Sequence, residues 1–270
     1  MHLSPDPHRR RPELTVSRNL RILILLLILT PLVFLFRSES DPVPDWDRTL
    51  SVAVYPYNVA GSEAVARHIA GFDQIQLEQI ADFFARESQR HQLALEQPFV
   101  LLLGKPINYA PPPPPRRGQG LARLRWALGL RWWRWRFDHQ GLAPDIVVVA
   151  RFNAANEAPP SLHSIGVAEL GLVVVNLPAL DSHRGYAQVL IAHEILHTVG
   201  ASDLYHPATG LPQFPAGYVE ASLEPRYPQD RAELMAGRIP IAPGRALQAT
   251  RLEDVQIGPR TAREIGWPGL

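Results

Sequence analysis

The sequence predicts an α+β fold in which helices cover a mixed β-sheet. Three observations support this: several apolar runs have the length of a strand, an amphipathic segment separates the first two runs, and a helical segment follows the last. Apolar runs without regular polar interruptions are typical of strands buried on both faces. The chain has 270 residues, 46% of them hydrophobic and 20% charged, which suits one domain with appendages.

The elements follow in a definite order along the chain. Strands are predicted over residues 50–58, 99–108, 145–153 and 170–178. A weaker edge strand is predicted over 161–169, because Gly166 interrupts a weakly apolar stretch. Helices are predicted over 72–92 and 184–199, where apolar residues recur at helical spacing.

The N-terminal region has the pattern of a membrane anchor. Residues 1–19 form a basic tail, 20–37 are almost entirely apolar, and 38–49 are polar and rich in proline, as in a linker. The arginines before the apolar run predict a cytoplasmic N-terminus and a domain in the periplasm or outside the cell. A cleaved signal peptide is the alternative, although no Ala-x-Ala pattern follows the run.

An insertion over residues 110–138 separates the second and third strands. Five prolines at 111–115 predict a polyproline II segment, and residues 121–137 predict a helix that is rich in Trp and Arg. This helix either lies on anionic lipid or packs on the core with solvated arginines. Residues 116–136 carry seven arginines and no acid, but the whole chain has a net charge of only +1, so no nucleic-acid partner is expected.

A possible metal site lies at the end of the 184–199 helix, in the sequence HEILHTVGASD. His193 and His197 are one helical turn apart, so both imidazoles can reach one metal ion. Glu194 flanks them, where a general base could contact a water on the metal. Gly200 can end the helix in the left-handed conformation, which lets Asp203 supply a third ligand. The chain contains no cysteine, which excludes a thiolate site and a cysteine nucleophile.

Other interpretations of these residues stay open at this point. His206 could be the third ligand in place of Asp203, since zinc accepts an imidazole equally well. Glu220 or Glu224 would fit another class of zinc site, but neither would explain the glycine at position 200. The histidines could also be solvated surface residues.

The motif HExxHxxGxxD resembles the signature of the metzincin zinc peptidases, in the snapalysin-like variant with aspartate as third ligand. The resemblance implies a twisted mixed sheet, an active-site helix, a methionine turn below the metal and a C-terminal helix. Met235 and residues 258–267 are the matching positions for the last two features. Some metzincins have a tyrosine two residues after this methionine, whereas this chain has Gly237.

The function expected from these features is that of a membrane-anchored zinc-dependent endopeptidase. The resemblance makes His193, His197 and Asp203 the ligands of one catalytic Zn²⁺ and Glu194 the general base. The partners would be a protein or peptide substrate, extended along the edge strand, and a membrane contacted through residues 20–37, with the 121–137 helix as a candidate second contact. The alternative is a tethered scaffold protein with a structural zinc site. If the enzyme is latent, a segment such as the 110–138 insertion would have to keep it inactive.

Overall fold

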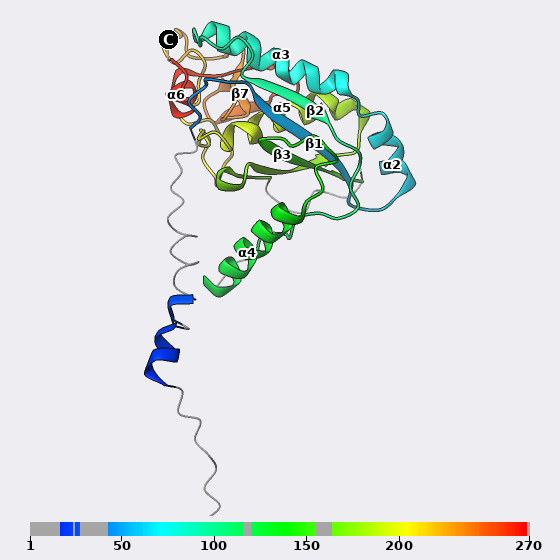
Figure 1. Cartoon of the computed structure of the whole chain (residues 1–270). Coiled ribbons are helices and arrows are strands. Elements are labelled where there is room, and N and C mark those ends of the chain that lie inside the picture. Colours follow the sequence, from blue (N-terminus) through cyan, green and yellow to red (C-terminus); the bar gives the residue numbers. More distant parts are fainter. Residues whose placement is uncertain (1–16, 24, 28–42, 116–119, 155–163, 269–270) are drawn as a thin grey trace, which may run out of the picture. The chain divides into compact units, whose positions relative to one another are not determined.

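The computed structural model describes residues 17–23, 25–27, 43–115, 120–154 and 164–268. The chain divides into two units, Met1–Ser40 and Asp41–Leu270. The second unit contains every labelled helix and strand (Figure 1).

The predicted transmembrane helix at 20–37 is not supported. Residues 18–23 and 25–27 are helical, and the other residues of the predicted segment, 24 and 28–37, lie outside the described residues. No helix in the described part of the chain has both the length and the apolar character that a membrane crossing requires. The prediction of a single-pass membrane protein with an exported domain is therefore corrected along with the anchor.

The α+β class and the mixed sheet are confirmed. The central sheet contains β1 (Leu50–Asn58), β2 (Phe99–Leu103), β3 (Ile146–Asn153), β4 (Ile165–Val167) and β5 (Leu172–Pro178). Their order is β2-β1-β3-β5-β4; β4 runs antiparallel to β5, and the other pairs are parallel. The apolar runs thus form the parallel strands, and the segment interrupted by Gly166 is an edge strand, as the sequence predicts.

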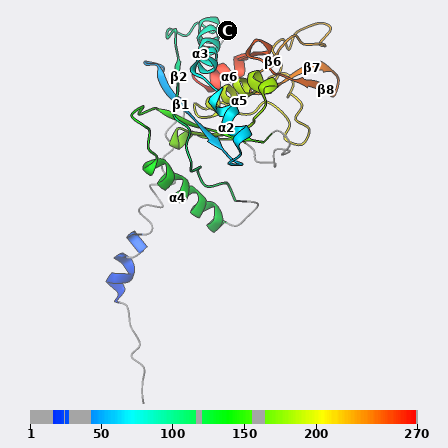
Figure 2. The ribbon, with the colours of Figure 1, turned by 90° about the vertical axis from the view of Figure 1, so that its right-hand side faces the viewer.

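Helices cover both faces of this sheet. The helices α2 (Glu63–Ala70), α3 (Gln74–Arg90) and α5 (Arg184–His197) lie on one face, and α4 (Gly120–Arg136) lies on the other (Figures 1 and 2). Side chains alternate along each strand, so Val52 and Val148 join the core beneath α3 and α5, whereas Ala53 and Val149 join the core beneath α4. Burial on both faces explains why these strands have no polar alternation.

The C-terminal region contains short strands and one short helix. Its elements are β6 (Ala232–Glu233), β7 (Arg238–Ala242), β8 (Arg245–Gln248), β9 (Val255–Gln256) and α6 (Pro259–Glu264). The described residues contain three 3₁₀ turns: Leu252–Asp254 in this region, and Ala168–Leu170 and Asp181–His183 before it. The helix α6 falls within the predicted 258–267 segment.

Two segments outside the regular elements pack against the domain. The predicted linker 38–49 lies partly outside the described residues, but Trp46 is buried and its indole N–H donates to the Ile265 carbonyl at 2.6 Å. In the insertion, the Trp126 indole donates to the Pro112 carbonyl at 2.9 Å. The proline segment is therefore fixed along α4.

Candidate metal centre

The helix α5 carries the two histidines on its buried side. Nine of its residues are buried, including His193 and Glu194, because α5 lies between the sheet and the C-terminal region. The two imidazoles are one turn apart, and their ring centroids are 4.8 Å from each other.

Backbone carbonyls fix the orientation of both rings. His193 Nδ1 lies 3.0 Å from the Leu234 carbonyl oxygen, and His197 Nδ1 lies 2.8 Å from that of Ala201. A carbonyl oxygen can only accept, so each Nδ1 must carry the proton. Each Nε2 is then available as a ligand, which is the usual arrangement of metal-bound histidines.

Gly200 directs the chain from the helix back to the histidines. Its φ of +105° is in the region that favours glycine, and the next residue, Ala201, donates its N–H to the Leu196 carbonyl at 3.0 Å. The resulting turn places the Ala201 carbonyl on His197 and brings Asp203 to the same point. The role that the sequence predicts for Gly200 agrees with this geometry.

Three potential ligand atoms form a nearly equilateral triangle. Asp203 Oδ1 is 3.1 Å from His193 Nε2 and 3.3 Å from His197 Nε2, and the two nitrogens are 3.2 Å apart. Around a tetrahedral ion with bonds of about 2.0–2.1 Å, ligand atoms lie about 3.3–3.4 Å from one another. The group formed by His193, His197 and Asp203 could therefore hold a metal ion with little movement.

The other candidate ligands do not join this group. The potential metal cluster that the described residues form contains neither His206 nor Glu220 nor Glu224. His206 is exposed, and its backbone pairs with the loop at Leu211 and Gly210. The geometry thus favours Asp203 over His206 as the third ligand.

Glu194 lies beside the histidines with one oxygen unpartnered. Its side chain is only 6% exposed, and no described residue forms a hydrogen bond with Oε2. Burial raises the pKa of Glu194, while His193 and His197 oppose the rise. A buried acceptor without a partner is costly unless water or a ligand contacts it. Glu194 therefore fits a site that receives a polar ligand.

Tyr205 is a functional candidate that the sequence analysis missed. Its hydroxyl donates to Asp203 Oδ2 at 3.1 Å, whereas Asp203 Oδ1 faces His193 Nε2. Burial and the neighbouring Asp203 raise the pKa of Tyr205 to about 12, so the hydroxyl keeps its proton at neutral pH. The neighbouring imidazoles of His193 and His197 hold the pKa of Asp203 well below its usual range despite partial burial. Asp203 is thus an ionised and oriented carboxylate.

The edge strand β4 lies directly against α5. A Cβ atom added to Gly166 would be 2.7 Å from His197 Cβ and 3.2 Å from the Glu194 carbonyl oxygen. Real side chains do not tolerate the shorter of these contacts without displacement. The glycine that marks an edge strand in the sequence therefore also lets that strand approach α5, the helix that carries His193 and His197.

The backbone around Met235, where the resemblance predicts a methionine turn, contacts His193 and the residue after Asp203. Met235 is fully buried, and its carbonyl accepts from the Leu204 N–H at 3.0 Å, while the adjacent Leu234 carbonyl contacts His193. Gly237, which stands where some metzincins have a tyrosine, has a φ of +68°.

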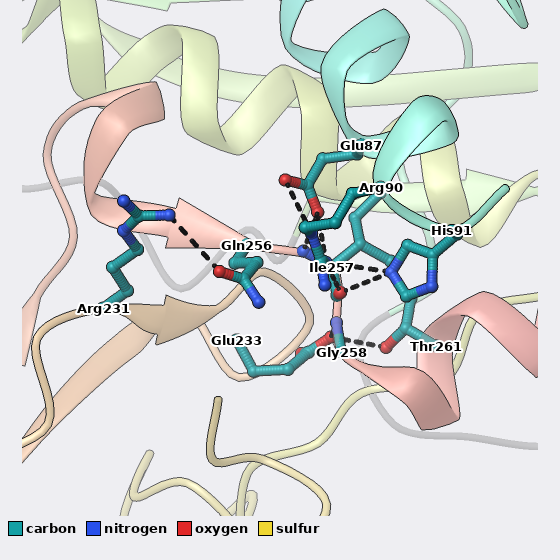
Figure 3. A network of polar contacts seen from close by, with 9 residues as sticks. All are labelled: Glu87, Arg90, His91, Arg231, Glu233, Gln256, Ile257, Gly258 and Thr261. Atoms are coloured by element: carbon teal, nitrogen blue, oxygen red, sulfur yellow. Dashed lines mark hydrogen bonds and ion pairs between the residues drawn. The ribbon is translucent and has the colours of Figure 1, made fainter. Parts of the chain in front are cut away.

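Glu233 fixes this turn from inside the protein. It is fully buried, and its carboxylate accepts from the Gly258 N–H at 3.0 Å and the Thr261 hydroxyl at 2.6 Å (Figure 3). It also accepts from the Ala236 N–H at 3.1 Å. Burial raises the pKa of Glu233, and these donors act in the opposite direction. The adjoining segment is tied to α3, because Ile257 donates its N–H to Glu87 at 2.8 Å and its carbonyl contacts Arg90 and His91 (Figure 3).

Comparisons with known proteins give no family for this chain. No family model matches it, and no curated protein matches it. Among solved structures, it is similar to a chain described as "Structure of a chaperone-substrate complex", with 11% identity and a TM-score of 0.34. The similarity covers 59% of this chain and 26% of that one, so the two share too little for a functional argument.

Proposed function

We propose that this protein is a zinc-dependent endopeptidase related to the metzincins. The observation that carries the proposal is the triangle of His193 Nε2, His197 Nε2 and Asp203 Oδ1, with the unpartnered carboxylate of Glu194 beside it. Three protein ligands with one open position are typical of catalytic zinc sites, whereas structural sites usually have four.

The donor set favours zinc over other metals. Two imidazoles and one carboxylate suit a borderline ion such as Zn²⁺, whereas Mg²⁺ and Ca²⁺ prefer sites made of oxygen atoms. When bound, zinc supplies a Lewis acid that activates water and polarises a peptide carbonyl. The carbonyls of Leu234 and Ala201 keep the ligand nitrogens of His193 and His197 free of protons for this role.

Glu194 is proposed to move the proton. Its free Oε2 is an acceptor for a proton from the attacking water, and the protonated carboxyl can later donate to the leaving amine. Burial, which raises the pKa of Glu194, brings its proton affinity closer to the range in which a general base works best. Removal of a general base typically reduces the rate about 10²–10⁴-fold.

The substrate is proposed to bind in an extended form along β4. This strand is at the edge of the sheet, and Gly166 brings its backbone within van der Waals reach of the metal-binding helix. A peptide that pairs with an edge strand gains backbone hydrogen bonds that do not depend on its side chains.

The test is the substitution Glu194→Gln in the zinc-loaded protein. We expect normal zinc content and loss of most casein hydrolysis, whereas Glu78→Gln, the same change at an exposed position of α3, should leave hydrolysis unchanged. Chelation should abolish the wild-type activity. A wild-type protein that holds zinc but hydrolyses no unstructured substrate would indicate a structural metal site instead.

A further inference from the structure

Helix α4 has two apolar faces, and the domain covers only one of them. Leu130 and Trp133 are buried against the sheet, and Trp126 is fixed by the Pro112 carbonyl. On the opposite side, large apolar residues remain exposed: Leu121 (80%), Leu128 (46%), Trp132 (58%) and Trp135 (80%). Core packing, one of the two sequence-based interpretations of this helix, therefore accounts for only one face.

The exposed apolar residues form a continuous stripe. At 3.6 residues per turn, Leu121, Leu128, Trp132 and Trp135 lie within about 60° of one another around the helix axis. The stripe extends over about 20 Å along α4. Both ribbon views show α4 on the other side of the sheet from α3 and α5, so these helices do not cover it (Figures 1 and 2).

Arginines flank this stripe on both sides. By the same helical geometry, Arg125 and Arg136 lie on one flank and Arg131 on the other. Arg136 also stacks on Trp132, with its guanidinium carbon 4.9 Å from the ring centroid. The helix has no acidic residue. Among the described residues, no acidic side chain forms an ion pair with any of the three arginines.

We propose that the exposed face of α4 binds the surface of an anionic lipid bilayer without crossing it. Tryptophan and arginine together suit the boundary between headgroups and acyl chains, where the indoles enter the apolar layer and the guanidinium groups bind phosphates. The positive charge without acidic partners favours anionic lipid over an apolar protein surface. The helix axis would lie parallel to the bilayer, with Leu121 and Trp135 at the two ends of the contact.

The test uses the full chain and brominated lipids. The chain has six tryptophans and none before position 46, so quenching of tryptophan fluorescence by brominated acyl chains reports on the domain and not on the apolar N-terminal segment. We expect quenching with vesicles of phosphatidylcholine and phosphatidylglycerol, and little with phosphatidylcholine alone. Trp46 and Trp267 are buried, so the quenched fluorescence should come from α4.

Two matched charge reversals distinguish an effect of this face of α4 from an effect of the net charge of the protein. Each basic residue near an anionic surface contributes a factor of about five to partitioning, so Arg125→Glu/Arg131→Glu should raise the lipid concentration for half-maximal quenching at least about 25-fold. Arg67→Glu/Arg86→Glu changes the net charge equally on α2 and α3 and should have a much smaller effect. Equal unfolding temperatures of the two variants exclude a folding defect as the cause.

Several results would overturn this proposal. One is unquenched wild-type fluorescence on anionic vesicles, whether or not the protein sediments with them. Another is quenching that the α4 reversal leaves unchanged or that the control reversal reduces equally. A single-stranded RNA that displaces the vesicles, or a dimer that the α4 reversal dissociates, would assign the face to another partner. Zinc binding and casein hydrolysis are separate readouts, so this proposal and the peptidase proposal can fail independently.

Discussion

Glu233→Gln tests how the C-terminal region supports the metal centre. The carboxylate accepts through both oxygens, since Oε1 contacts Gly258 N–H and Thr261 (Figure 3), and Oε2 contacts Ala236 N–H. Glutamine replaces one oxygen with an NH₂ group. In either orientation that group faces a backbone N–H, so a fully buried donor loses its acceptor and meets another donor.

The expected loss of stability follows from these contacts. Leaving a buried donor unsatisfied costs about 1–3 kcal/mol, and in this variant two donors face each other, so we expect the free energy of unfolding to fall by about 3 kcal/mol. For a domain of this size, that corresponds to a decrease in Tm of about 6–12 °C. Because Leu234 follows Glu233 and its carbonyl orients His193, zinc affinity should also decrease.

Urea denaturation monitored by circular dichroism measures this loss. Glu253→Gln is the matched control, because it makes the same chemical change at an exposed residue outside the network. We expect the control to lie within about 0.5 kcal/mol of the wild type. An equally small effect of Glu233→Gln would refute the assignment of Glu233 as the buried acceptor that fixes this turn.

Two further substitutions test the close approach of β4 and the joining of β1 to β3. Gly166→Ala should cost about 1–3 kcal/mol in unfolding free energy and weaken zinc binding, because the new methyl group meets His197 Cβ at 2.7 Å. Gly120→Ala, where the methyl group meets no atom within 4 Å, is its control, and equal zinc affinities in the two variants would contradict this reasoning. Asp145→Asn should lower the free energy of unfolding at pH 7 by about 2 kcal/mol, since Asp145 binds Arg48 at 2.8 Å and the Ser51 N–H at 2.8 Å. Arg48 holds the pKa of Asp145 below its usual value. The ionised Asp145 therefore stabilises the fold at neutral pH, and this stabilisation is lost as the pH falls below about 4. If urea titrations give the same difference in unfolding free energy between the wild type and Asp145→Asn at pH 7 and at pH 3, this linkage is excluded.

The sequence predicts the parts of the fold that depend on local pattern. The parallel strands appear as apolar runs because both of their faces are buried, and Gly166 marks the edge strand. The motif HExxHxxGxxD predicts the cluster of His193, His197 and Asp203, because i,i+4 spacing and a glycine that ends a helix are local properties of the sequence. The helix α2 is absent from the prediction, since its eight residues contain only two buried positions, Val65 and Ile69.

The remaining features depend on contacts between distant segments. The carbonyls of Leu234 and Ala201 orient the histidines, but every residue has a carbonyl, so no sequence pattern identifies them. Glu233 lies in a short strand, and its role depends on Gly258 and Thr261, which are 25 and 28 residues away. Trp46 lies in a segment with the composition of a linker, yet its indole bonds to Ile265 at the far end of the chain. Hydropathy alone also led to the transmembrane prediction, which the described helices do not support.

The stoichiometry of bound zinc in three proteins tests the central claim most directly. Native mass spectrometry of the wild type, Asp203→Ala and His206→Ala measures it after dialysis against a weak chelator. We predict one zinc ion per chain in the wild type and in His206→Ala, and none in Asp203→Ala, because Asp203 Oδ1 completes the triangle with His193 and His197. Zinc retained by Asp203→Ala and lost from His206→Ala would contradict the assigned ligands, and a wild type without zinc would contradict the site itself.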